Sequence, residues 1–389
     1  MRYSFITLAD IHWGAMDSTL MYQNLELVIQ FIQKMKDQLD FVVIAGDYFD
    51  YRLQLNSKTA LLAVEWFDRL MRTCRESGVK RVRMFKGTRG HDNDQLEVFR
   101  PSYETGDGYF RLFNTTTSEE VLPGLRCVFC PDENMNLLDY HRIYPDKFFP
   151  HPDIGFFHGS FDSVLPSIEF QRIQDHRIDT VVYEYDKFSR LIKGPMISGH
   201  WHVASNTGDL YYVGSFDRWA FDEEEDKGFI YGEYDTETHE YFIHRVKNPL
   251  AREFKTLIVT DETTNTPAHF SELTDMIDTL LHESGDMKLR VSYIVSSEND
   301  GAMVAFNTFQ RKFASNPRVK IIVKDLVKRE LKREKKEKTQ IEASQYQYVF
   351  DQDIRKVPSI IQRFIKDKKG VDIELPIIDK YVSKYLDLK

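Results

Sequence analysis

The stretch FITLADIHWG, residues 5–14, passes from a short apolar run directly into a carboxylate and an imidazole, Asp10 and His12. The apolar run is typical of a buried strand. The stretch FVVIAGDYFD, residues 41–50, repeats this order, with Asp47 after its apolar run. Open α/β sheets place their sites in the loops at strand ends. The pattern therefore predicts an α/β fold with a functional site at the ends of its strands.

Three later segments place imidazoles in the same setting. They are GTRGHD (87–92) with His91, FFHGS (156–160) with His158, and ISGHWH (197–202) with His200 and His202. Carboxylates and imidazoles without a thiolate suit Mn²⁺, Fe²⁺ or Zn²⁺ in a catalytic site better than a structural zinc. The ordered set therefore predicts a metal site, built from Asp10, His12, Asp47, His158, His200 and His202.

Length and composition limit the class of protein. A chain of 389 residues, 42% of them hydrophobic, is long enough for two or three domains with substantial cores. It has no stretch near the roughly 18 consecutive apolar residues of a membrane span, and its start resembles a strand rather than a signal peptide. We therefore expect no membrane association and a cytoplasmic location. A net charge of -9 does not exclude DNA binding, because phosphate contact depends on local cationic clusters and metal ions.

The cysteines fit a reducing compartment. Cys74, Cys127 and Cys130 are an odd number and offer no pairing framework. The last two lie in the apolar run LRCVFC, where strand alternation points their sulfurs to opposite faces. We expect buried structural thiols.

Two domains are predicted before the charged part of the chain. Residues 1–248 alternate strand-like and helical patterns and then continue as short strands separated by turns, which predicts a two-sheet αβ sandwich that carries the site. The pair Asn248-Pro249 marks its end. Residues 249–325 follow as strand, helix, strand, helix and strand, which predicts a small α/β domain.

The remaining residues divide into a charged connector, 326–350, and an apolar C-terminal segment, 351–389. The stretch KRELKREKKEK (328–338) carries seven basic and three acidic side chains. A solvated helical connector is the simpler interpretation, and binding to a phosphate backbone is the alternative. Pro358 and Pro376 open two short amphipathic helices in the last segment. Such helices need a partner surface, either a groove beside a coiled coil or the body of the chain itself.

The ligand set is suited to phosphoryl chemistry. Two divalent ions roughly 3.5 to 4 Å apart can activate water, clamp a phosphate and neutralise the charge of an in-line displacement. Such a pair needs one bridging carboxylate, and Asp47 at a strand end is the natural bridge. Asp10 and His12 would then bind one ion, and His158 the other.

The remaining polar groups have supporting roles. His200 and His202 lie two residues apart, so in an extended segment their imidazoles point the same way and can serve one ion each. Asp50 and Asp92 are candidates to orient a ligand or a catalytic imidazole. His91 remains free to protonate a leaving oxygen as general acid.

Together these motifs resemble the calcineurin-like metallophosphoesterase superfamily, and within it the SbcD-type nuclease subunit. The likeness lies in the ordered string D-x-H, G-D-x-x-D, G-H-D, H and G-H-x-H over residues 1–230. It also lies in YVGSFDRWAFDEEEDKGF (212–229), which is similar to the family's stretch after the last metal histidine. The resemblance implies an αββα metallophosphoesterase sandwich at 1–248, a capping domain at 249–325, and a pair of ATPase-binding helices at 351–389.

The resemblance also implies the roles of individual residues. It implies a first metal held by Asp10, His12, Asp47 and His202, and a second metal held by Asp47, His158 and His200. Two Mn²⁺ ions are implied, with Mg²⁺, Fe²⁺ and Zn²⁺ as alternatives, and His91 is implied as the catalytic imidazole. The family has asparagine immediately before that histidine, as a ligand of the second metal, whereas this chain has Gly90. We expect an extra water there, with Asn93 as a weaker candidate to compensate.

The implied partners are DNA and an ATPase. The resemblance implies an SbcC-type coiled-coil ATPase bound through 351–389, and a homodimer within a heterotetramer. Basic residues around the His91 loop are candidates to contact the phosphate backbone, chiefly Arg83, Lys86 and Arg89. The expected activity is Mn²⁺-dependent cleavage of linear DNA, as exonuclease and endonuclease.

Two other functions stay open at this point. The same scaffold could be a phosphatase for a phosphoprotein or a small molecule, although such enzymes need neither the extra domain nor the terminal helices. A non-catalytic DNA-end-binding scaffold would follow if Gly90 had weakened the second metal site. Turnover of a monoester but not of DNA would favour the phosphatase, and fewer than two bound ions would favour the scaffold.

Overall fold

The computed structural model describes residues 1–54, 56–132, 150–164, 182–221, 223, 225–283, 287–296, 300–325, 361–362, 365–366 and 372–378. The predicted connector at 326–350 lies outside the described residues. Within the predicted helix pair at 351–389, the described residues 361–362, 365–366 and 375–378 are helical.

Internal contacts divide the chain into two compact units. The first comprises Met1–Thr256 with the short pieces Asp278–Arg290 and Pro317–Lys320, and the second begins at Leu257. The first unit therefore extends a little past the predicted domain end at residue 248.

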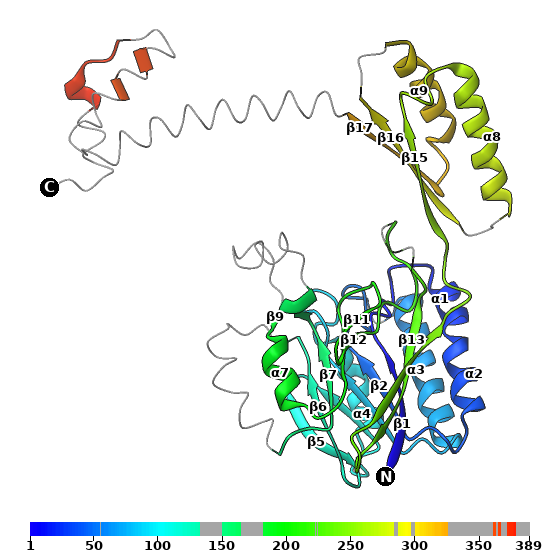
Figure 1. The fold of residues 1–389 in the computed structure, drawn as a ribbon, viewed down its shortest axis with the longest axis vertical. Helices are drawn as coiled ribbons and strands as arrows, with labels where there is room; N and C mark the ends of the chain where they lie inside the picture. Colours follow the sequence, from blue (N-terminus) through cyan, green and yellow to red (C-terminus); the bar gives the residue numbers. More distant parts are fainter. Residues whose placement is uncertain are drawn as a thin grey trace. The chain divides into compact units, whose positions relative to one another are not determined.

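Two mixed six-stranded sheets form the first unit (Figure 1). The first sheet has the order β14-β13-β1-β2-β3-β4. Its strands are β1 (Arg2–Leu8), β2 (Phe41–Ala45), β3 (Arg81–Phe85), β4 (Phe110–Phe113), β13 (Gly228–Asp235) and β14 (Tyr241–Lys247). Strands β1 to β4 run parallel, whereas β13 is antiparallel to both of its neighbours. Because parallel strands place their carboxyl ends at one edge, the loops after β1, β2 and β3 lie together.

The second sheet has the order β11-β12-β10-β7-β6-β5. Its strands are β5 (Thr117–Leu122), β6 (Leu125–Cys130), β7 (Ile154–His158), β10 (Met196–Gly199), β11 (Ser205–Thr207) and β12 (Leu210–Tyr212). Strands β6, β7, β10 and β12 are parallel to their neighbours in this group. A separate short pairing joins β8 (Ser160–Phe161) to β9 (Val182–Tyr183). The carboxyl ends of β7 and β10 therefore also lie side by side.

Three apolar cores hold the layers of this unit together. Between the two sheets, Phe5 and Phe41 pack against Phe156 with ring centroids 5.8 Å and 6.2 Å apart. The other face of the first sheet packs against α1 (Ser18–Asn24), α2 (Glu26–Lys34) and α3 (Lys58–Glu76). The outer face of the second sheet packs against α7 (Tyr185–Leu191), where Phe157 and Phe188 lie 5.4 Å apart. The unit is an α/β fold, and its layers run helix, sheet, sheet, helix.

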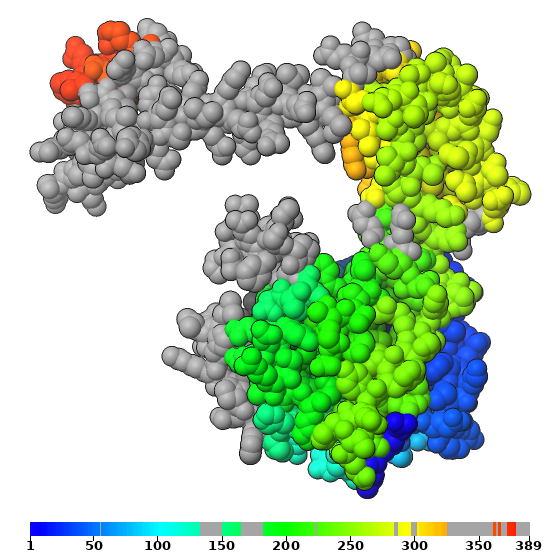
Figure 2. Space-filling model, viewed as in Figure 1, coloured from blue at the N-terminus to red at the C-terminus, as the bar shows by residue number. Residues whose placement is uncertain are grey.

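Local sequence explains where these helices begin. Asp17 accepts hydrogen bonds from the backbone N–H groups of Thr19 and Leu20 at the start of α1. Ser57 accepts one from Ala60 at the start of α3. Helix α2, blue at the surface in Figure 2, buries the apolar stripe Val28, Ile29 and Ile32. Among the described residues of this unit, the other short helices are η1 (Gln95–Phe99), α4 (Arg100–Tyr103) and η2 (Asp162–Val164).

Three strands and two helices follow in the order predicted for residues 249–325. They are β15 (Phe254–Thr260), α8 (Pro267–Glu283), β16 (Lys288–Val295), α9 (Asp300–Phe313) and β17 (Val319–Asp325). The strands form a sheet in the order β15-β16-β17. Tyr293 of β16 stacks on Phe306 of α9 at 4.5 Å and meets Phe270 of α8 at 5.6 Å. These elements therefore share an apolar core of their own.

The cysteines lie as the strand pattern predicts. Cys74, Cys127 and Cys130 are free and buried. Cys127 lies in the core between the sheets, whereas Cys130 lies in the core beneath α7. The prediction that these two sulfurs point to opposite faces is therefore confirmed.

Among the helices that the structure describes, none has the length and apolar character needed to cross a bilayer.

Candidate metal centre

The six predicted ligands come from four loops or strand ends of the first unit. Asp10 and His12 follow β1, Asp47 follows β2, His158 ends β7, and His200 and His202 follow β10. Their ligand atoms fall into groups that lie within 4.8 Å of one another: Asp10, His12 and His202; Asp47, His158 and His200; and His12, Asp47 and His91. The structure therefore brings together all six residues and the predicted catalytic imidazole.

Close contact between the two sheets makes this convergence possible. The His158 Nδ1 atom of one sheet donates to the Ala45 carbonyl of the other at 2.8 Å. A side chain at Gly199 could not fit beside this contact, because its Cβ would lie 2.6 Å from the Ala45 oxygen and 2.8 Å from His158 Nδ1. Glycine at this position therefore allows the second sheet to deliver its histidines to the loops of the first.

Four of the ligands have an unusual backbone conformation. The φ angles of Asp10, His12, Asp47 and His200 are +50°, +54°, +49° and +85°. Left-handed backbone costs a non-glycine residue about 1 to 2 kcal/mol, and such strain is concentrated at functional sites. The surrounding structure therefore holds these ligands in place against a local preference. His200 is not in the extended conformation that the sequence analysis expected for the ISGHWH segment.

The first cluster places two imidazole nitrogens face to face. The Nε2 atoms of His12 and His202 lie 3.0 Å apart. The Nδ1 atom of His202 lies 2.8 Å from a carboxylate oxygen of Glu223, and that of His12 lies 3.2 Å from one of Asp50. Because each carboxylate favours a proton on the Nδ1 atom beside it, the two Nε2 lone pairs point into the same space. A cation there would be stabilised by both.

Asp10 adds a carboxylate to this cluster. It is fully buried, and both of its oxygens lie 3.0 Å from the backbone N–H of His200. Burial raises the pKa of the Asp10 carboxyl, although the neighbouring His158 and His202 act in the opposite direction. A carboxylate without solvent, beside two imidazoles, fits a divalent ion.

The second cluster contains a neutral and a charged imidazole. Burial, and then the charge of His158, lower the pKa of His200 to about 3, so His200 is neutral and able to bind a metal. Burial opposes charge on His158, but Asp47 outweighs it and raises the pKa of His158 to about 10. His158 Nε2 lies 3.2 Å from Asp47 Oδ2. Without an ion, the proton on His158 therefore stabilises the negative charge of Asp47. A metal ion can replace that proton.

Asp47 lies between the two clusters. Its Oδ1 atom accepts a hydrogen bond of 2.6 Å from the backbone N–H of Thr88. Its Oδ2 atom lies 3.2 Å from His158 Nε2 and 3.9 Å from His12 Nε2. Burial raises the pKa of Asp47, but His158 and then His12 lower it by more, so this carboxyl is ionised. A single oxygen therefore faces both clusters, as a bridging ligand must.

His91 lies at the edge of the centre and is partly exposed. Its ring centroid is 4.6 Å from that of His12, and 35% of its side chain is accessible. Its Nδ1 atom contacts the backbone carbonyl oxygen of Asp50. Because that oxygen can only accept, Nδ1 carries the hydrogen, and Nε2 remains for a substrate.

Asp50 and Asp92 both support the centre, but in different ways. Asp50 contacts His91 through its carbonyl and His12 through its carboxylate, and this close contact with His12 lowers the pKa of Asp50. Asp92 is fully buried and accepts hydrogen bonds from the backbone N–H groups of Phe49 (3.0 Å) and Gly87 (2.7 Å). Burial, and then the charge of Asp47, raise the pKa of Asp92 to about 6. Asp92 therefore joins the loops after β2 and β3 and orients their ligands through the backbone.

Gly90 contributes no side chain to the second cluster. A Cβ atom at Gly90 would have nothing within 4 Å, so a side chain there would point into open space. Thr88, two residues earlier, points at the second cluster instead: its Oγ1 atom lies 3.1 Å from Asp47 Oδ2 and 3.3 Å from His158 Nε2. Loop conformation decides which residue faces the centre, and the sequence contains no signal for it.

Two further acidic residues lie near the centre, outside the predicted set. Glu223 belongs to the acidic run of the 212–229 stretch, and besides His202 it contacts Lys227 at 2.9 Å. Its spacing of four residues from Lys227 gives no sequence signal, because Glu223 and Lys227 are not in a helix. Asp132 follows β6, and burial raises its pKa to about 6, with His158 and Asp47 as neighbouring charges. Asp132 follows the apolar run LRCVFC with one residue between, as Asp47 follows its own run, so the same sequence signal was available for it.

The predicted DNA contact of Arg83 is wrong. Arg83 is buried, with 3% of its side chain accessible, and it pairs with Glu119 of the other sheet while donating to the carbonyls of Val82 and Tyr109. A guanidinium held this way cannot reach a phosphate. Lys86 is 20% accessible and lies 3.4 Å from Asp94, whereas Arg89 is exposed. Of the three candidates, Arg89 is thus the most accessible.

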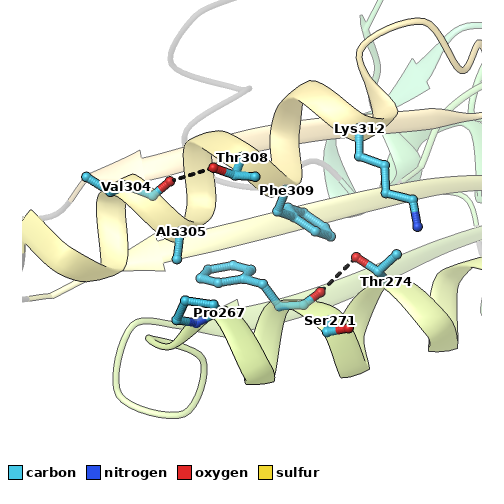
Figure 3. A pocket seen from close by; sticks show the side chains of 9 residues that line it. Pro267, Ser271, Thr274, Val304, Ala305, Thr308, Phe309 and Lys312 are labelled. Carbon is cyan, nitrogen blue, oxygen red and sulfur yellow. Dashed lines mark hydrogen bonds between the residues drawn. The ribbon is translucent and has the colours of Figure 1, made fainter.

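A pocket of about 490 Å³ lies elsewhere, between α8 and α9 in the second unit. Figure 3 shows that Val304, Ala305 and Phe309 of α9 face Pro267 and Thr274 of α8 across it, with Lys312 at one end. The pocket is lined without a carboxylate or an imidazole, so it has no set of metal ligands. We therefore place the candidate site at the two clusters.

Neither a protein-family model nor a curated protein sequence matches the chain at a significant level.

Proposed function

We propose that this protein is a two-metal phosphodiesterase that cleaves DNA, in the manner of the SbcD-type nucleases that its motifs resemble. The observation that carries the proposal is the position of Asp47, whose Oδ2 atom faces His158 of one cluster and His12 of the other. Two three-residue groups, with the Asp47 carboxylate of one facing His12 of the other, are suited to a pair of divalent ions. The donor set of carboxylates and imidazoles fits Mn²⁺, with Mg²⁺, Fe²⁺ and Zn²⁺ as alternatives.

When bound, the ions would supply an activated water and neutralise charge on the phosphate. The first would be held by Asp10, His12, Asp47 and His202, and the second by Asp47, His158 and His200. The protein's own part in proton transfer falls to His91. The Asp50 carbonyl fixes a hydrogen on its Nδ1 atom, so Nε2 is the atom from which a proton would pass to the leaving oxygen.

The domain order supports the same proposal. The helix, sheet, sheet, helix unit would be the metallophosphoesterase sandwich, and the small α/β sheet with α8 and α9 would be the capping domain. Residues 351–389 would bind an SbcC-type coiled-coil ATPase, in a heterotetramer containing two copies of this chain, in the cytoplasm. Arg89 and Lys86 beside the His91 loop are the remaining candidates for phosphate contact.

The alternatives have less support. A non-catalytic scaffold was suggested by the missing side chain at Gly90, and that residue faces open space rather than the second cluster. A phosphatase would use the same centre, so the two enzyme classes differ in substrate alone. No specific contact among the described residues favours a monoester.

A nuclease assay tests the proposal directly. Linear DNA should be cleaved in the presence of Mn²⁺, cleavage should stop with a chelator, and His91→Ala should abolish it while metal binding persists. The same preparations should be tested on a phosphomonoester. Turnover of the monoester without DNA cleavage would overturn the nuclease assignment, and full DNA cleavage by His91→Ala would remove the assigned acid.

A further inference from the structure

The side chain of Thr88 lies among the donor atoms of the second cluster. Its Oγ1 atom is 3.1 Å from Asp47 Oδ2 and 3.3 Å from His158 Nε2. Its backbone N–H holds the other oxygen of Asp47 at 2.6 Å. Thr88 therefore has a fixed position relative to two predicted ligands, through its backbone as well as its hydroxyl.

These separations match those of ligands on one ion. Carboxylate oxygens and imidazole nitrogens lie about 2.1 Å from a divalent metal, so two such atoms at right angles are about 3 Å apart. The hydroxyl of Thr88 meets this spacing toward both Asp47 and His158. An ion in contact with these two residues would therefore have the Thr88 oxygen within bonding reach.

The second cluster also has room for a further ligand. Its described group contains three donor residues, Asp47, His158 and His200. Ions such as Mn²⁺ prefer six ligands in octahedral geometry, and neutral oxygens are suitable donors. Gly90 cannot supply one, because it faces open space.

We propose that the Thr88 hydroxyl is a ligand of the second metal ion and completes the protein's share of that site. The inference rests on the two-metal centre of the proposed function. It gives a metal-binding role to a threonine, whereas the motif around His91 contains no threonine as a ligand.

A structural role for Thr88 makes a different prediction. If its hydroxyl only donated a hydrogen bond to Asp47, its removal would disturb a carboxylate that faces both clusters, and both ions would bind more weakly. A ligand of the second ion would instead affect that ion selectively. The ratio of the two affinities therefore separates the roles.

The test is a Mn²⁺ titration of the full chain, by calorimetry and by electron paramagnetic resonance of free Mn²⁺. Thr88→Val keeps the shape of the side chain and removes the oxygen, Thr88→Ser keeps the oxygen, and Gly90→Asn is the matched control in the same loop. We expect two ions in the wild type, and a loss of tenfold or more in the affinity of one ion in Thr88→Val. Thr88→Ser and Gly90→Asn should remain within threefold of the wild type for both ions.

Several outcomes would overturn the inference. Wild-type affinities in Thr88→Val, or an equal loss at both sites, would show that the hydroxyl is not a ligand of the second ion. Thermal unfolding of the metal-free variants checks their folding, and Thr88→Ala serves as a second variant if Thr88→Val fails to fold. Fewer than two ions in the wild type would overturn the two-metal centre itself, whereas two ions that Thr88→Val binds normally would overturn the Thr88 role alone.

Discussion

The Nε2 atoms of His12 and His202 face each other at 3.0 Å, although the residues are 190 positions apart in the chain. Each ring has a carboxylate at its other nitrogen, Asp50 for His12 and Glu223 for His202. Carboxylates in this position orient metal-binding imidazoles and raise their basicity. The first cluster is therefore prepared for a cation by residues that would not touch the cation themselves.

Glu223→Gln should weaken the first metal ion selectively. The variant keeps a polar side chain beside His202 but removes the charge that favours the Nδ1 proton, and such changes typically cost about 10-fold to 100-fold in metal affinity. The second ion should be affected by less than threefold. Glu225→Gln, an exposed neighbour, is the control. Unchanged binding of both ions in Glu223→Gln would contradict a positioning role.

Mn²⁺ binding should release protons near neutral pH. Asp47 raises the pKa of His158 to about 10, so His158 in the metal-free protein is protonated at pH 7 to 8, and a metal must displace that proton. Apparent affinity should therefore rise as the pH rises through this range. Calorimetry in buffers with different ionisation enthalpies measures the released protons. A binding heat that is independent of the buffer would be inconsistent with this assignment.

Arg83→Met should destabilise the protein without a direct effect on DNA contact. Arg83 is buried and pairs with Glu119, so its removal leaves a buried carboxylate with fewer partners and should cost about 3 kcal/mol of unfolding free energy. Urea denaturation of the metal-free protein measures this change. Arg72→Met, which breaks the exposed pair with Asp68, should change stability by less than about 0.5 kcal/mol. Equal free energies of unfolding for the two variants would show that the buried pair contributes no more to stability than the exposed pair.

The three cysteines should be inert in the folded protein. Cys74, Cys127 and Cys130 are buried, and burial raises the pKa of the Cys74 and Cys127 thiols. A thiol-specific chromogenic reagent should react with none of them at neutral pH and with all three after denaturation. Rapid labelling of one thiol in the native state would place that cysteine at the surface.

The sequence predicts the position of the centre well, because apolar runs before Asp10, Asp47 and His158 mark strands whose ends converge. Helical spacing and turn signals likewise predict the five elements of the small α/β unit. Parallel strands then bring the ligands together, because their carboxyl-end loops lie at one edge of each sheet.

What the sequence cannot predict depends on contacts between distant segments or on backbone angles. Arg83 appeared available for DNA because its partner, Glu119, belongs to another sheet. The motif spacing likewise does not show that Thr88 is the loop residue that points at Asp47 and His158. The left-handed backbone of His200 is likewise imposed by its surroundings rather than by residue type.

Anomalous scattering from a Mn²⁺-soaked crystal would show directly whether Asp47 bridges two metal ions. We expect two peaks about 3.5 to 4 Å apart, both in contact with the Asp47 carboxylate. A single peak, or two peaks of which one has no contact with Asp47, would contradict this expectation.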